Sequence, residues 1–283
     1  MDLIVETDIG HDPDDLFAIC YLIAAGVNIR AILISPGDPD QIAIARFICD
    51  ETGLNIPIGV SHLDRTKFSS GSVHYQLLKE FKYPLERKAD GLGSDILQDV
   101  IKSYPDSELF VIGPVASIGF YMMKHPETHF KRATMQGGFL PYSLYNPKQP
   151  YDKFDGKSWM PTFNLNGDRS SGVTFLSGNV GERQIVGKNI CHTVLFNKEV
   201  WQKRDPVVKN YTARNLFNRA AEMYLEKHDF KKFHDPTAAV CHLHPEIGTW
   251  VRGNTVQQER GWTTTLNPAG DKILADIDYD ALW

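Results

Sequence analysis

The amino-acid sequence predicts an α/β protein with an open, mostly parallel, twisted sheet covered by helices on both faces. Two observations lead to this prediction. Short apolar runs rich in β-branched residues alternate with longer segments whose apolar residues recur at helical spacing. The 283 residues also show no internal repeat, linker or break in composition, so we expect a single domain over residues 1–283.

The first half of the chain supplies this alternation in order. Residues 3–5 form a short apolar run that stops at acidic residues, which is typical of a buried parallel strand. Residues 14–25 have the pattern of a helix that ends at Gly26. Further strands are expected at 27–35, 56–60, 109–112 and 133–136. Further helices are expected at 40–51, 95–103 and 115–124.

The second half is less regular. Residues 140–159 are rich in Pro, Tyr, Lys and Asp and lack periodicity, so we expect either a surface excursion or a lid over a site. A long helical pattern covers residues 206–227 and a shorter one covers 235–242. The tail from Gly253 alternates loosely, which predicts a terminal hairpin or edge strands.

Composition narrows the class of partner. The formal net charge of −5 provides no basic field for nucleic acid or an anionic membrane, so a small-molecule substrate is expected. The first residues lack the pattern of a signal peptide, and the longest apolar stretch is shorter than the ~20 residues of a membrane span. The cysteines are far apart, which predicts buried free thiols in a reducing, cytoplasmic compartment. They are Cys20, Cys49, Cys191 and Cys241.

An acidic cluster follows the first predicted strand. Residues 6–15 place five carboxylates within ten positions, at the carboxyl end of a strand, where open α/β sheets bind ligands. Helix capping offers a simpler explanation for three of them: Asp12 caps a helix before Pro13, and Asp14 and Asp15 favour its dipole.

Capping leaves Asp8 unexplained, because this residue precedes the turn and has no helix to cap. It also leaves unexplained why so many like charges gather where their repulsion costs stability. A hard cation resolves both problems, since Ca²⁺ collects carboxylate and carbonyl oxygens, and Gly10 permits the tight turn that brings the cluster together. The sequence therefore predicts a metal site, with Ca²⁺ preferred over Mg²⁺.

The segment Glu6-Thr7-Asp8-Ile9-Gly10-His11-Asp12-Pro13-Asp14-Asp15 resembles the Asp-x-Asp-Pro-Gly-x-Asp-Asp motif of the nucleoside hydrolase family. Glu6 replaces the first Asp, Ile9 replaces Pro, and two residues are inserted. The resemblance implies that Asp8 and Asp15 hold the metal and that Asp8 is also the general base. It implies that Asp14 binds the ribose hydroxyls, although the insertion leaves the choice between Asp12 and Asp14 open.

Later segments resemble further family motifs in the same order. Ser35-Pro36-Gly37-Asp38 resembles a Gly-Asn that contacts the sugar, with Asp38 in place of Asn; a plain surface turn explains it equally well. Gly113-Pro114-Val115-Ala116-Ser117 resembles Gly-Pro-Leu-Thr-Asn, which implies that the Ala116 carbonyl binds the metal. Asp90-Gly91-Leu92-Gly93 and Met135-Gln136-Gly137-Gly138 also match family segments.

Two matches complete the implied site. Thr162-Phe163-Asn164 resembles the family's Glu-Phe-Asn, which implies that Asn164 binds the sugar and that Thr162 replaces a Glu on its 5′ side. His234-Asp235-Pro236 resembles the His-Asp that closes the site, although Asp235 also has the pattern of a helix cap. By resemblance, Asp235 binds both metal and substrate, and His234 is the acid for the leaving base.

The resemblance implies a Rossmann-like nucleoside hydrolase fold, an inosine-uridine preferring type of enzyme, and a homodimer or homotetramer. The implied reaction is metal-dependent hydrolysis of the N-glycosidic bond of a nucleoside or related riboside, by direct attack of water with inversion. Base specificity stays open; residues 140–159 and the helix around Tyr224 are candidate pocket walls. One alternative is a non-catalytic riboside- or Ca²⁺-binding protein, given the departures at Glu6 and Thr162. Another is a phosphatase with an Asp nucleophile, against which Glu6 argues because it occupies the nucleophile's position.

Overall fold

The structure is a computed structural model that describes residues 1–203 and 209–282. Its strands are β1 (Asp2–Thr7), β2 (Asn28–Ile34), β3 (Ile58–Val60), β4 (Gly91–Leu92), β5 (Glu108–Val111), β6 (Phe130–Gln136), β7 (Val180–Val186), β8 (Leu195–Asn197), β9 (Phe230–Lys232), β10 (Gly248–Gln257), β11 (Trp262–Leu266) and β12 (Asp271–Ile277). Its helices are α1 (Asp14–Ala24), α2 (Pro39–Thr52), α3 (Ser72–Glu80), α4 (Gly93–Ser103), α5 (Ala116–Lys124), α6 (Phe163–Gly167), α7 (Arg169–Ser177), α8 (Lys188–Cys191), α9 (Lys198–Lys203), α10 (Tyr211–Leu225) and α11 (Asp235–Leu243), with short 3-10 turns η1 (Asp152–Phe154) and η2 (Pro245–Ile247). Within the described ranges, no helix has both the length and the apolar character that a membrane crossing requires.

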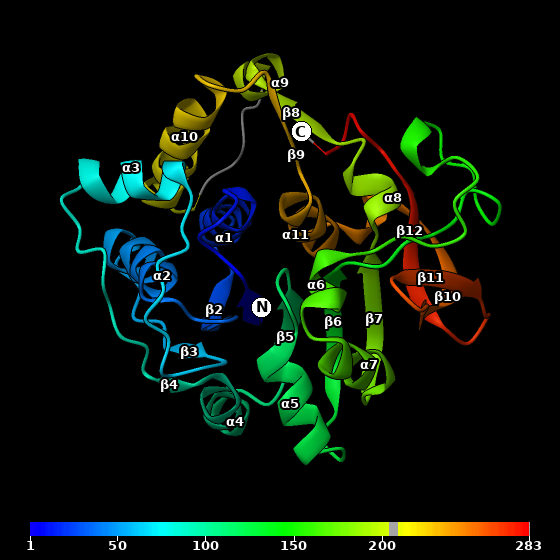
Figure 1. Ribbon diagram of the computed structural model, residues 1–283, viewed down its shortest axis with the longest axis horizontal. Coiled ribbons are helices and arrows are strands. Elements are labelled where there is room, and N and C mark those ends of the chain that lie inside the picture. The colour runs from blue at the N-terminus through cyan, green and yellow to red at the C-terminus, as the bar shows by residue number, and fades with distance from the viewer. Residues whose placement is uncertain (204–208, 283) are drawn as a thin grey trace.

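A ten-stranded sheet forms the centre of the molecule, with helices on both faces (Figure 1). The strand order is β11-β10-β12-β7-β6-β5-β1-β2-β3-β4. Strands β1 to β7 pair in parallel, and β12 joins β7 in parallel, whereas β10 pairs antiparallel with β11 and β12. The predicted fold class, an open and mostly parallel sheet flanked by helices, is therefore confirmed.

The order in which successive strands join the sheet switches from one side of β1 to the other. This strand pairs with β2 on one side and with β5 on the other. From β1 the chain moves outward to β4 and then returns to β5, from which it builds the opposite half of the sheet. The carboxyl ends of β1 and β5 therefore flank the crevice where open α/β sheets bind ligands.

Alternation along β1 divides the core between the two faces. Leu3 and Val5 belong to a cluster with residues of α1, α2, α10 and α11, while Ile4 belongs to a second cluster with residues of α4, α5 and α7. All three side chains are fully buried. Because both faces of the strand are covered, its sequence is continuously apolar.

The first half of the chain agrees with the predicted elements within a few residues, but α3 and β4 were not predicted. The tail forms the predicted edge hairpin, β10–β11, and β12 inserts beside β7. The predicted long helix corresponds to α10, and the part of that prediction at 206–208 lies outside the described residues. Residues 140–159 contain only the short turn η1 as regular structure.

Strand β7 was missed because its centre is polar. Arg183 and Gln184 are nevertheless buried, since each has a partner on a neighbouring strand. Arg183 forms an ion pair with Asp271 at 2.8 Å, and Gln184 accepts a hydrogen bond from Thr134 at 3.0 Å. Hydrogen-bond and ion-pair partners that are distant in the sequence thus allow polar residues to be buried in this strand. Hydrophobic periodicity alone therefore does not indicate that the segment is a strand.

Glu6 ties β1 to the first turn of α5. Its two carboxylate oxygens accept hydrogen bonds from the backbone N–H groups of Ser117, at 2.6 Å, and Ile118, at 3.0 Å. The side chain is fully buried, and this burial raises the pKa of Glu6 to about 8 although the N–H donors act to lower it. Glu6 thus satisfies the unpaired N–H groups at the start of a helix.

We expect Glu6→Gln to reduce the free energy of unfolding by about 1–3 kcal/mol. The amide keeps one acceptor oxygen but turns an NH₂ group toward a second backbone N–H, which then stays buried without an acceptor. Denaturant unfolding measures the change, with Glu86→Gln at an exposed position as the matched control. Equal stability of the Glu6 and Glu86 variants would contradict this role.

Candidate active site

A cavity of about 290 Å³ opens at the carboxyl ends of the central strands and brings together most of the predicted site residues. The predicted residues that line it are Asp8, Asp14, Asp15, Asn164, His234 and Asp235. They come from the turn after β1, from α1, from α6 and from the start of α11. Segments more than 200 residues apart in the sequence thus meet in one pocket.

A larger cavity of about 590 Å³ lies between α1, α10 and α11. Its lining is mostly apolar, with residues such as Phe217 and Val240, and contains none of the predicted site residues. The smaller cavity is the candidate active site because the ionisable groups converge there.

Carboxylates form the floor of the pocket and repel one another. Burial, reinforced by the charges of Asp12 and Asp14, raises the pKa of Asp8 to about 7. Burial and the charge of Asp8 raise the pKa of Asp15 well above its usual value, and burial and the charge of Asp15 do the same to Asp235. Among the described residues, however, no three His, Cys, Asp or Glu side chains already form a metal-binding cluster.

Local hydrogen bonds fix the acidic turn that follows β1. The hydroxyl of Thr7 donates to the Asp15 carboxylate and accepts the backbone N–H of Ile9 at 3.0 Å. The side chain of Gln41, in α2, donates to the backbone carbonyl of Asp8 at 3.1 Å. The acidic turn is therefore held in place from α1 and α2.

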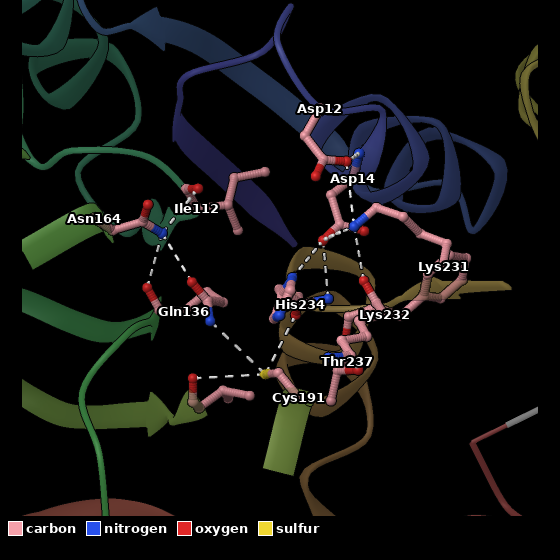
Figure 2. Close-up of polar contacts among 12 residues, drawn as sticks. Asp12, Asp14, Ile112, Gln136, Asn164, Cys191, Lys231, Lys232, His234 and Thr237 are labelled. Atoms are coloured by element: carbon pink, nitrogen blue, oxygen red, sulfur yellow. Dashed lines mark hydrogen bonds and ion pairs between the residues drawn. The ribbon is translucent and has the colours of Figure 1, made fainter. Parts of the chain in front are cut away.

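Asp14 is the hub of a charged network that includes a lysine (Figure 2). Its Oδ2 atom accepts from the backbone N–H of His234 at 3.0 Å and lies 3.1 Å from the Nδ1 atom of the same residue. The ammonium group of Lys231 lies 3.3 Å from Asp14 and 3.2 Å from Asp12. Burial acts to raise the pKa of Asp14, but Lys231 and His234 outweigh it and lower the pKa.

The sequence did not indicate Lys231. It lies in the short strand β9 and belongs to no motif, yet its side chain is 6% exposed and its pKa is raised, despite burial, by Asp14 and Asp12. The excess of negative charge in the predicted acidic cluster was the only signal that a buried cation would be needed.

Asn164 is fixed against the strand ends. Its side-chain nitrogen donates to the carbonyls of Ile112 and Gln136 and to the side-chain oxygen of Gln136, each at 3.0 Å (Figure 2). Ile112 and Gln136 line the pocket but were not predicted as site residues.

Two predicted residues lie outside the pocket lining. Asp38 caps α2 and forms an ion pair with Arg65 at 2.7 Å. Ala116 is the first residue of α5, whereas the residue of this chain segment that lines the cavity is Ile112. Tyr224, on α10, was predicted as a candidate pocket wall and also lies outside the lining; its ring stacks on that of His228, with centroids 4.3 Å apart.

The pocket lining also contains two further residues that were not predicted, namely Lys188 and His192. The His192 ring lies edge-on to His234, with centroids 5.0 Å apart. Phe154 and Tyr151 pack against His192 at centroid distances of 5.0 and 5.5 Å. The segment 140–159 therefore buttresses one wall of the pocket.

Comparison with known proteins gives one family. The family model described as "Inosine-uridine preferring nucleoside hydrolase" matches residues 3–283. No curated protein sequence matches the chain.

Solved structures of nucleoside hydrolases share the fold. A plant nucleoside hydrolase, PpNRh1, has a TM-score of 0.72 at 16% identity, covering 99% of this chain and 96% of that one. A purine-preferring ribonucleoside hydrolase from Gardnerella vaginalis has a TM-score of 0.69 at 20% identity, covering 100% and 95%. The inosine-uridine preferring nucleoside hydrolase from Bacillus anthracis has a TM-score of 0.70 at 14% identity, covering 99% and 96%.

The match over nearly the whole chain agrees with the acidic strand end, the Phe-Asn segment and the His-Asp pair that the pocket brings together. The chain belongs to the inosine-uridine preferring nucleoside hydrolase family, whose enzymes hydrolyse the N-glycosidic bond of nucleosides.

Proposed function

We propose that this pocket hydrolyses the N-glycosidic bond of a riboside with the help of one divalent cation, Ca²⁺ in preference to Mg²⁺. The observation that carries the proposal is the set of three carboxylates, Asp8, Asp15 and Asp235, whose pKa values are raised by burial and, in addition, by the charges of neighbouring carboxylates. Such a donor set fits a hard cation, which removes the repulsion by binding the charged forms.

A backbone carbonyl completes the proposed ligand set. Ile112 is better placed for this role than Ala116, because it lines the pocket at the end of β5 and its carbonyl faces the side-chain nitrogen of Asn164. We therefore propose Asp8, Asp15, Asp235 and the Ile112 carbonyl as the residues that hold the cation.

The ribose hydroxyls bind Asp14, Asn164 and Asp235 in this proposal. Asp14 is favoured over Asp12 because its Oδ1 atom is buried without a hydrogen-bond partner among the described residues. Asp12, whose side chain is 51% exposed, is the less enclosed of the two. An unpaired buried oxygen at the pocket surface is suited to a substrate hydroxyl.

The chemistry follows from the charges of the floor. A cation held by these residues would supply a lower pKa for the attacking water. Asp8 takes a proton from the attacking water, whose oxygen forms a bond to C1′ while the C1′–N bond breaks and its electron pair leaves with the base. The surrounding carboxylates stabilise the positive charge that develops on the ribosyl group. His234, oriented by Asp14, donates a proton to the departing base. A trapped ribosyl-enzyme adduct would exclude this direct route with inversion.

Two expectations complete the proposal. We propose that the enzyme acts in the cytoplasm, which the four free, buried cysteines support. A homodimer or homotetramer remains a prediction to be tested by sedimentation.

We predict that Asp8→Asn lowers kcat for base release by about 10²- to 10⁴-fold, because the amide cannot accept the proton of water. The measurement is release of free base and free ribose from a panel of purine and pyrimidine ribosides. Asp106→Asn, at an exposed position away from the pocket, is the matched control. Binding of ribosides by the wild type without any release would instead identify a non-catalytic binding protein.

We predict that the stabilisation given by Ca²⁺ increases with pH. In the folded state without metal, the pKa of Asp8 is raised to about 7 and the pKa values of Asp15 and Asp235 are raised well above their usual range, whereas the unfolded state loses these protons near about pH 4. The folded state thus binds more protons in this window, so its stability falls as the pH rises. Asp14, whose pKa is lowered, titrates below the window.

Bound Ca²⁺ would take the place of these protons, so the increase in the protein's Tm on adding Ca²⁺ is expected to be largest at the alkaline end of this pH range. At a hundredfold excess over Kd we expect about 5 °C or more near pH 8 and a smaller gain near pH 5.5. Thermal unfolding with Ca²⁺ or chelator measures both, and Asp15→Asn should abolish most of the effect. A Tm gain that is independent of pH and of Asp15 would place the cation elsewhere.

A further inference from the structure

The part of the pocket wall that is formed by Thr162, Lys188 and His192 includes a partly buried lysine. Lys188 lines the cavity, and its ammonium group donates to the carbonyl of Pro161 at 2.7 Å. Among the described residues, no Asp or Glu forms an ion pair with Lys188. A partly desolvated ammonium without a counter-ion costs free energy, so it favours an anionic ligand.

Two polar atoms on the same wall lack partners. Thr162, which precedes Phe163 at the start of α6, is 3% exposed, and its hydroxyl has no hydrogen-bond partner among the described residues. The Nδ1 atom of His192 is likewise buried and unpartnered within the described structure. Both residues line the pocket, and Pro161, the acceptor for Lys188, directly precedes Thr162. The ammonium, the hydroxyl and the imidazole thus offer hydrogen bonds to one ligand group.

Several positively charged side chains act on this part of the wall. Burial is the largest cause that lowers the pKa of His192 to about 3, and the charges of nearby basic groups lower it further; these are His234, Lys232, Lys188 and Lys153. Burial and the charge of Lys153 also lower the pKa of Lys188. Cations from η1, α8 and β9 therefore surround a pocket whose floor is strongly acidic.

We propose that the substrate is a riboside that carries an anionic oxygen group, and that Lys188 and Thr162 bind this group. The inference rests on the proposed function and specifies its substrate class. An anionic substrate would be repelled by the floor unless a cation in the pocket wall offset the repulsion, which is the role of Lys188. At position 162, where the resemblance indicates a Glu, the neutral Thr removes a carboxylate that would repel the anion.

Two chemistries supply such a group: a phosphate on the ribose C5′ and a carboxylate on the base. Uridine, uridine 5′-monophosphate and orotidine share the same ring and sugar, and they separate these sources. Hydrolysis of the monophosphate gives uracil and ribose 5-phosphate, and hydrolysis of orotidine gives orotate and ribose. Inosine and inosine 5′-monophosphate repeat the comparison with a purine. We expect kcat/KM for one anionic substrate to exceed that of its neutral counterpart.

Substitutions test whether Lys188 sets this preference. Lys188→Gln should reduce the ratio of anionic to neutral kcat/KM by about 10- to 100-fold, whereas Lys188→Arg should retain most of it. Thr162→Glu should reduce the same ratio by returning a carboxylate to the wall. Lys88→Gln, at an exposed position outside the pocket, should leave the ratio unchanged.

A binding measurement gives a readout that does not depend on turnover. Calorimetric titration compares ribose 5-phosphate with ribose, and orotate with uracil. The wild type should bind one anionic compound more tightly than its neutral partner, and Lys188→Gln should remove that difference. Tighter binding of ribose 5-phosphate assigns the anion to C5′, and tighter binding of orotate assigns it to the base.

Different outcomes of these experiments would contradict the anionic-substrate inference and the hydrolase proposal. If neutral ribosides are cleaved as well as the anionic ones and Lys188→Gln affects both equally, the anionic-substrate inference is wrong and the hydrolase proposal stands. If well-folded enzyme with Ca²⁺ releases base from none of the five compounds but binds an anionic compound through Lys188, the inference about the ligand stands and hydrolysis is overturned. If it neither cleaves nor binds any of them, both are overturned.

Discussion

The repulsion among buried carboxylates is the constraint around which this molecule is built. Asp8, Asp14, Asp15 and Asp235 share one pocket, and Lys231 is the buried cation that directly contacts their cluster. Its ion pair with Asp14 keeps that carboxylate charged, while the pKa values of the other three rise. The charge of Asp14 is thus neutralised within the protein by Lys231. The other three carboxylates have no such ion pair in the described structure, and we propose that a bound cation neutralises them.

The position of the acidic turn in the sheet leaves the pairing of the central strands intact. The reversal of strand order at β1 puts the acidic turn at the carboxyl end of a central strand, where its backbone is not needed for strand pairing. Glu6, one residue before the end of β1, is instead used inside the protein to bind α5. The strand ends at Thr7, between Glu6, whose carboxylate binds α5, and Asp8, which lines the pocket.

The sequence predicted the sheet class from the alternation of apolar runs and helical segments along the chain. It also indicated the acidic turn after β1, the Phe-Asn segment and the His-Asp pair as candidates for the site, because each lies within a short stretch that has its own pattern. Lys188, His192 and Lys231 were not predicted, because each is an isolated residue in a segment without a motif. Tertiary folding brings Lys188 and His192 to the pocket lining and Lys231 to Asp12 and Asp14. Strand β7 was missed for a similar reason, since its polar residues are satisfied by distant partners.

The hydrogen bonds between Asp14 and His234 join residues 220 positions apart. During synthesis from the N-terminus, the acidic turn therefore emerges long before the strand and helix that balance it. The nascent chain carries these carboxylates hydrated, and their desolvation is postponed until β9 and α11 dock against α1. Assembly of the pocket is thus a late event of folding, and a chain that stops short of β9 retains an exposed acidic edge in place of an enclosed site.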